Sequence, residues 1–140
     1  MKNQSKILVL LMALFCFSFV MNAQNLNKGN LLGLHAGTLK LAPNVTMQQY
    51  VSHFKNQLKP VLEKEFQCKV IMVESVRGKN AKQVGFIWLF ASDAARNKVY
   101  KAENVMTEYG EKAMKNAQPA IDAWNKLGTI SSDYTDWVVL

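Results

Sequence analysis

The stretch VGFIWLFA, residues 84–91, decides the fold because it contains no charged or amide side chain. Aromatic and branched apolar residues of this kind favour a β-strand. An antiparallel strand with one face in water alternates apolar and polar residues, and residues 84–91 do not alternate. We therefore expect a strand that is covered on both faces.

Further strands and helices are predicted around this stretch from hydrophobic spacing and turn residues. The expected strands lie at 30–41, 68–76 and 134–140, and the loop at 77–82 makes a hairpin of 68–76 and 84–91. The expected helices lie at about 46–66, 92–100 and 107–127.

Local signals set the ends and bends of the helices. Thr46, followed three residues later by a glutamine, forms a capping box at the start of the first helix. Pro60 lacks a backbone N–H, so it predicts a kink or a restart near Lys59. Pro119 predicts a kink in the last helix, and Gly128 stands where a C-terminal cap is expected.

The main elements follow in the order β-α-β-β-α-β, which is that of a ferredoxin-like split sandwich of the α+β class. In that fold two helices cover one face of a four-stranded antiparallel sheet, and the other face stays open. Residues 84–91 are apolar on both faces, and residues 31–39 are nearly so. Since two helices cannot cover both faces, we expect the missing layer from a second copy of the chain. This predicts a homodimer.

The chain resembles the dimeric α+β barrel superfamily, whose members pack the open faces of two ferredoxin-like sheets together. The resemblance covers essentially all of residues 24–140. It rests on the element order and on four local patterns: Pro60, Arg77-Gly78, LAPNVT at 41–46 and FASDAAR at 90–96. Superfamily members include monooxygenases of small aromatic compounds, haem-degrading enzymes, isomerases, mutarotases and proteins without known activity. The resemblance therefore implies the fold and leaves the reaction open.

Residues 1–23 have the pattern of a signal peptide. Two lysines precede a largely apolar run at 7–20, and Ala23 is the small residue best placed for cleavage. The run is shorter than the roughly 20 residues that a membrane-spanning helix needs. The Asn-Ala-Gln junction at the cleavage point resembles secretory signals of Bacteroidetes-type bacteria. We expect a single domain at 24–140 that is periplasmic or secreted, with no membrane attachment after cleavage.

Composition and ligand types argue against several classes of function. The 140 residues carry 17 Lys and Arg against 10 Asp and Glu, a net charge of +7. The basic residues are mostly single lysines among acidic ones, so nucleic-acid binding is not expected. His35, His53 and Cys68 are the strong nitrogen or sulfur ligands of residues 24–140, and their spacing predicts no metal site. No cofactor is expected, because residues 89–140 lack the histidine through which some superfamily members bind haem.

His35 is the leading candidate for a catalytic side chain. It lies mid-strand between Gly33 and Gly37 on the same face, which leaves space around its ring for a ligand or a partner backbone. An imidazole that titrates near neutral pH could act as an acid, a base or a ligand-binding group. Burial should lower its pKa, unless a carboxylate such as Glu74 or Asp136 lies close enough to raise it. The structural alternative is a buried histidine held by hydrogen bonds.

Aromatic side chains are candidates for the walls of a ligand cavity. Phe86 and Trp88 share one face of the strand at 84–91, where they could line an apolar pocket or fill the core. Tyr134 and Trp137 point to opposite faces of the last strand, so at most one of them shares a cavity with Trp88. Tyr134 is the candidate ligand-binding residue of the two.

Tyr50 and His53 lie three residues apart on the first helix and could form the polar edge of a pocket. Tyr50 belongs to the apolar stripe of that helix, and His53 lies at its margin. The alternative is therefore a core tyrosine beside an exposed histidine.

Three functions fit these patterns. The first is an exported dimeric barrel that binds a small apolar or aromatic molecule. The second is a cofactor-independent enzyme of the same fold, monooxygenase-like or isomerase-like, with His35 as acid or base. The third is a structural or interaction protein whose barrel is filled with side chains. A pocket lined by His35 and Trp88 favours the first two, and dense packing there favours the third.

Overall fold

The computed structural model describes residues 26–78, 83–102 and 105–140. The predicted signal peptide and its cleavage point lie outside these residues, as does the part of the hairpin loop at 79–82. Within the described ranges, no helix is both long enough and apolar enough to cross a membrane.

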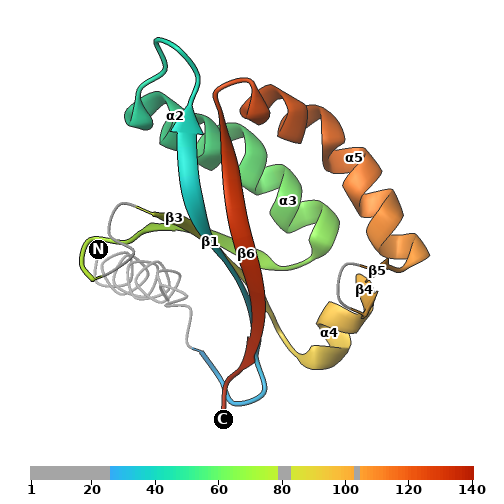
Figure 1. The fold of residues 1–140 in the computed structure, drawn as a ribbon. Helices are drawn as coiled ribbons and strands as arrows, with labels where there is room; N and C mark the ends of the chain where they lie inside the picture. Colours follow the sequence, from blue (N-terminus) through green and yellow to red (C-terminus); the bar gives the residue numbers. More distant parts are fainter. Residues whose placement is uncertain (1–25, 79–82, 103–104) are drawn as a thin grey trace, which may run out of the picture.

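Four strands form one antiparallel sheet in the order β2-β3-β1-β6 (Figure 1). In the centre, β1 and β3 pair with Leu31 opposite Phe90 and Gly37 opposite Val84. This is the strand order of the predicted ferredoxin-like fold, and the α+β prediction is confirmed. The strands are β1 (Leu31–Leu41), β2 (Lys69–Glu74), β3 (Val84–Phe90) and β6 (Gly128–Val138).

The first helical region has three parts: α2 (Met47–His53), a π-helical turn η1 (Phe54–Leu58) and α3 (Lys59–Phe66). The capping box is present, because the Thr46 hydroxyl accepts a hydrogen bond from the Gln49 N–H and the Gln49 side chain accepts one from the Thr46 N–H. The restart predicted at Pro60 is confirmed, since α3 begins at Lys59. The π-turn that precedes it was not predicted, and it carries the chain past a residue that has no N–H to donate.

The second long helix, α5 (Glu108–Asn125), differs from the prediction in two places. It continues through Pro119 without a break, and Pro119 lies on the exposed side, where water can bind the carbonyl that the proline leaves free. Gly128 is not a helix cap. It is the first residue of β6 and pairs with Leu41, and a Cβ at this position would lie 3.0 Å from the Lys40 carbonyl oxygen. The close approach of the two strands favours glycine here.

Two further predictions are corrected at the edges of the fold. The last strand begins at Gly128 and not at Tyr134, because its polar first half pairs with β1 as an exposed edge strand. The short helix α4 (Asp93–Asn97) ends earlier than predicted. The chain after it forms a small hairpin of β4 (Tyr100–Ala102) and β5 (Val105–Met106).

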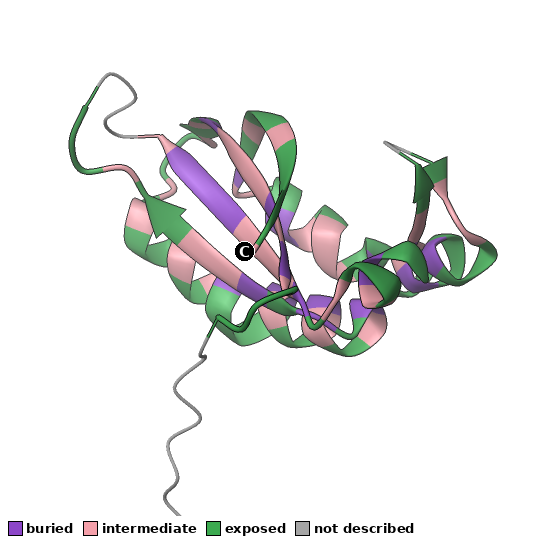
Figure 2. Cartoon of the chain, turned by 90° about the horizontal axis from the view of Figure 1, so that it is seen from below, coloured by how far each residue is buried: buried purple, intermediate pink, exposed green. Residues whose placement is uncertain are grey.

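The long helices all lie on one side of the sheet (Figure 1), and the core fills the space between them and the sheet. In Figure 2 buried and half-buried residues run along the middle of the sheet, and exposed residues lie on the outer turns of the helices. The register places His35, Phe86 and Trp88 on the side of the helices.

None of the described helices covers the opposite side of the sheet. It carries an apolar patch that we call the open face. Within it, Val73 is 37% and Trp137 is 60% exposed. The register assigns to the open face Leu32, Leu34, Ile71, Val73, Ile87, Leu89 and Trp137.

Candidate functional site

A cavity of about 190 Å³ lies between the sheet and the helices, and we call it the His35 pocket. Half of its lining side chains belong to the buried core, and the others are half-buried or exposed. The buried wall consists of Phe54, Leu58, Leu62, Val70, Phe86 and Trp124. The more accessible part consists of His35, Trp88, Met114, Ile121, Ile130 and Ser132.

The η1 turn, strand β3 and helix α5 position the aromatic walls of the pocket. Phe54, the first residue of η1, lies 5.4 Å from Phe86 and 5.8 Å from Trp124, measured between ring centroids. Phe86 and Trp124 meet edge to face at 5.4 Å. These distances and angles are those of favourable aromatic contacts, so the rings support one another around the cavity.

His35 reaches the pocket from the middle of β1, where it is paired with Phe86 on one side and Tyr134 on the other. Its ring centroid lies 6.4 Å from that of Trp88 and 4.6 Å from that of Tyr134. The structure therefore brings three of the predicted residues, His35, Phe86 and Trp88, to one cavity, and places Tyr134 against the His35 ring.

Burial lowers the pKa of His35 below its ordinary value of 6.5, and the negative charge of Asp136 opposes this shift without overcoming it. Desolvation disfavours the charged imidazolium. The neutral imidazole is therefore the favoured form of His35 at pH 7. A neutral imidazole has one nitrogen that donates and one that accepts a hydrogen bond.

Tyr134, whose ring contacts His35, begins a chain of polar contacts that runs toward α4. Its hydroxyl donates a hydrogen bond to Asp136, and the other oxygen of that carboxylate is 2.8 Å from the guanidinium of Arg96. The Arg96 side chain is buried, and its guanidinium carbon lies 4.9 Å from the centroid of the Tyr100 ring. Burial and the hydrogen bond to Asp136 raise the pKa of Tyr134 to about 12.

Gly33 makes room for this polar chain. A Cβ at Gly33 would lie 3.0 Å from the Tyr134 ring and 3.3 Å from a carboxylate oxygen of Asp136. The absence of a side chain lets both groups lie across β1, next to His35. The space that the sequence predicts around His35 is thus partly filled by residues of β6.

Tyr50 and His53 take different places. Tyr50 is fully buried, and its ring stacks on Trp124 at 4.6 Å with an interplanar angle of 29°, so it contacts a wall of the pocket without lining it. His53 lines a separate hollow of the surface with polar side chains of α2 and η1. The hydroxyl of Tyr50 and one ring nitrogen of His53 are buried and have no hydrogen-bond partner among the described residues.

Three residues around the pocket were not singled out from the sequence as site residues. Ser132 lies in the polar half of β6, and no face could be assigned to it because that segment was not predicted to be a strand. Trp124 follows the apolar spacing of its helix, but nothing in that spacing distinguishes a cavity wall from ordinary core. Arg96 forms an ion pair with Asp136, a tertiary contact that no local sequence pattern predicts.

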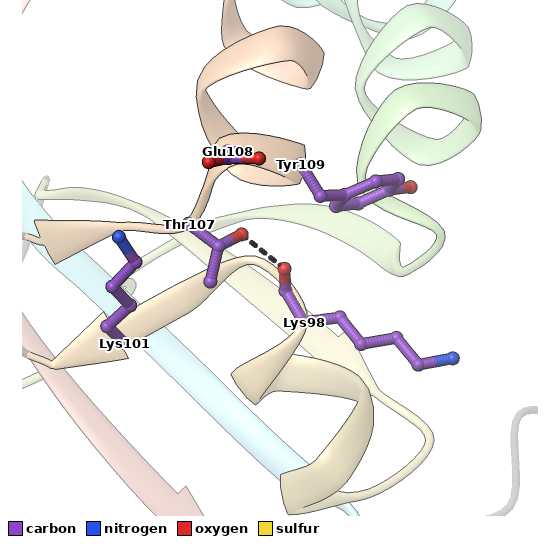
Figure 3. Close-up of a pocket in the computed structure, with 5 residues that line it drawn as sticks. All are labelled: Lys98, Lys101, Thr107, Glu108 and Tyr109. Atoms are coloured by element: carbon purple, nitrogen blue, oxygen red, sulfur yellow. Dashed lines mark hydrogen bonds between the residues drawn. The ribbon is translucent and has the colours of Figure 1, made fainter.

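Other hollows are larger and more open. The one in Figure 3 has a volume of about 470 Å³ and is lined by Lys98, Lys101, Thr107, Glu108 and Tyr109. Figure 3 shows the two lysine side chains extending in opposite directions, so they do not converge on one anion. Within the described ranges, no cluster of three or more His, Cys, Asp or Glu residues could hold a metal ion.

No protein-family profile and no curated protein sequence matches this chain. A solved structure of a NIPSNAP family protein from Agrobacterium tumefaciens str. C58 is similar, with a TM-score of 0.54 and 15% identity over 81% of this chain and 89% of that chain. A mutant form of SnoaB, a cofactor-independent oxygenase from Streptomyces nogalater, gives a TM-score of 0.46 and 13% identity over 79% of this chain and 93% of that chain. At these identities the similarity to the NIPSNAP family protein shows the ferredoxin-like fold alone.

Proposed function

We propose that this protein binds a small apolar or aromatic molecule in the His35 pocket. The observation that supports this function is the cavity itself. Protein cores are close-packed, with few voids larger than a water molecule, whereas this domain keeps about 190 Å³ open among aromatic walls. A concave, mostly apolar site with a few polar groups is typical of small-molecule binding. A protein with a purely structural role would be expected to fill this space.

We further propose that the open face pairs with a second copy of the chain. Its central residues, Leu32, Leu34 and Ile87, are apolar, and none of the described helices covers them. An apolar patch is complementary to its own copy, so a twofold dimer would bury both patches at once. The pairing would remove Trp137 and Val73 from water, where their exposed area is unfavourable.

A second candidate function is acid–base catalysis by His35 without a cofactor. The specific observation in its favour is that the pKa of His35 is perturbed downward while a polar chain from Tyr134 and Asp136 touches its ring. Perturbed titratable groups that have a polar partner in a cavity are common at active sites. A neutral imidazole at pH 7 is the form that accepts a proton.

We also propose that the protein acts outside the cytoplasm, as a periplasmic or secreted protein that begins at Gln24. This proposal rests on the sequence pattern at 1–23. N-terminal mass mapping of the protein isolated from its native compartment tests it. A product that retains the apolar run at 7–20 would contradict it.

Native mass spectrometry of the exported protein tests binding and pairing together. We expect the mass of two processed chains, together with a retained or added small apolar ligand. A filling variant, Ile130→Trp, should keep the dimer mass and lose the ligand, because the larger side chain occupies the pocket. A wild-type protein that is a monomer at micromolar concentration contradicts the dimer. Equal ligand retention by Ile130→Trp contradicts binding in the His35 pocket.

A further inference from the structure

We propose that the His35 pocket selects a neutral, single-ring aromatic molecule that bears a hydroxyl group, that is, a ligand of the phenol class. This inference rests on the proposed binding function and extends it to the size, the charge and the polar group of the ligand. Each of these three properties follows from a different feature of the pocket.

The volume of the pocket sets the size of the ligand. An apolar protein cavity of about 150 Å³ holds one benzene molecule. The His35 pocket, at about 190 Å³, therefore accepts one aromatic ring with a small substituent. Its aromatic side chains offer edges and faces to such a ring, as they already do to one another.

The distribution of polar groups sets the orientation of the ligand. The wall from η1 and α3, with Leu58 and Leu62, is apolar and buried. His35 and Ser132 lie together on the side of the neighbouring strands β1 and β6, and Ser132 is exposed to solvent. A ligand ring would therefore point toward the helices, and its polar substituent would lie between His35 and Ser132 at the mouth.

The charge of the lining sets the charge of the ligand. Among the described residues, no Asp, Glu, Lys or Arg side chain lines the pocket, and the partial burial of His35 lowers its pKa, which favours the neutral imidazole. A carboxylate or an ammonium group would lose its hydration without meeting an opposite charge. A hydroxyl group suits a neutral imidazole in either tautomer, because it can both donate and accept a hydrogen bond.

The three tryptophans of the chain provide the measurement. Trp88 and Trp124 line the pocket, and Trp137 lies on the open face. We would follow their indole N–H signals by NMR while adding phenol, toluene, benzoate or benzylammonium to the exported protein. We expect phenol and toluene to shift the signals of Trp88 and Trp124 and to leave Trp137 unchanged. Phenol should bind about three- to tenfold more tightly than toluene, the gain of one neutral hydrogen bond, and the two ions should cause no shift.

Variants at the mouth of the pocket test whether His35 and Ser132 cause the preference for phenol over toluene. His35→Phe keeps a ring of similar size and should reduce phenol binding to the level of toluene. Ser132→Ala changes an exposed side chain, so it tests the same preference without a risk to folding, and it should weaken phenol about twofold to threefold. His53→Gln is the matched control, because His53 lies in a different hollow, and it should leave both ligands unaffected.

The outcomes separate this inference from the function on which it rests. If toluene binds as tightly as phenol in these titrations, the pocket binds small molecules but does not select a hydroxyl, and only the present inference is overturned. If benzoate or benzylammonium binds as tightly as phenol, the argument from charge is wrong. If the phenol preference survives in both His35→Phe and Ser132→Ala, the assignment to these residues is wrong. If no probe shifts either signal at millimolar concentration, the proposed binding function itself is contradicted.

Discussion

The two faces of the sheet both carry apolar side chains, but they differ in whether helices of the chain cover them. On the face toward the helices, β1 and β3 present His35, Phe86 and Trp88, and the chain covers them while leaving a cavity. On the open face, Leu34 and Ile87 are equally apolar, but the described helices do not reach them. The first face shows what the helices of this chain cover, and the second shows apolar residues that the described helices leave uncovered.

Replacing neighbouring residues of β3 by lysine should give the largest difference between the two faces. Trp88→Lys places a charge among the buried aromatic side chains and should destabilise the protomer by about 3 to 5 kcal/mol. Ile87→Lys places the same charge on the open face and should leave a folded monomer. Urea denaturation and analytical ultracentrifugation measure the two effects. Two variants that behave alike would mean that the two faces do not differ in the proposed way.

The glycines of β1 test how tightly the strands pack on the helix side. A Cβ at Gly37 would lie 1.9 Å from the Ser131 carbonyl oxygen, so Gly37→Ala should force β1 and β6 apart and cost about 3 kcal/mol of stability. Gly33→Ala meets the Tyr134 ring, a side chain that can shift, and should cost about 1 kcal/mol. Thermal unfolding of the two variants measures the difference. A larger loss for Gly33→Ala would contradict the geometry of the β1–β6 pairing.

The ion pair of Arg96 with Asp136 tests the polar chain behind His35. Arg96→Met removes the positive charge from a carboxylate whose side chain is only 29% exposed, and it should lower the free energy of unfolding by about 1 to 3 kcal/mol. Lys98→Met is the control, because Lys98 is exposed and has no ion pair among the described residues. Urea denaturation compares them. A neutral effect of Arg96→Met would show that the pair does not hold the fold together.

The pH dependence of stability gives the smallest expected effect. The pKa of His35 is lower in the folded protein than in the unfolded chain, so the unfolded chain binds the proton more readily as the pH falls below about 6.5. Wild-type stability should therefore decrease between about pH 7 and the folded pKa of His35, and His35→Phe should lack this part of the decrease. Asp136→Asn should lower the pKa of His35 further, because Asp136 raises it. Histidine-resolved NMR titration measures both pKa values, and a pKa near or above 6.5 in the wild type would contradict the burial argument.

Much of the fold followed from local patterns. The apolar stretch at 84–91, the capping box at Thr46 and the restart at Lys59 are properties of neighbouring residues, so the sequence alone was enough to predict them. The polar half of β6 could not be predicted in the same way. Its residues form a strand because the full length of β1 lies beside them, and this pairing is not visible in the local sequence.

The sequence by itself determined which residue types were available for a site and which of them share a face of a strand. His35 lies between two glycines on one face of its strand, and Phe86 and Trp88, two residues apart, share a face of theirs. Only the tertiary structure decided that these residues face the helices, that Ser132 and Trp124 join them, and that His53 lies elsewhere. The physical reason is that strand alternation sorts side chains into two sets, whereas the packing of helices on one side decides which set is buried. The charge of His35 depends on that packing as well, because burial sets its pKa.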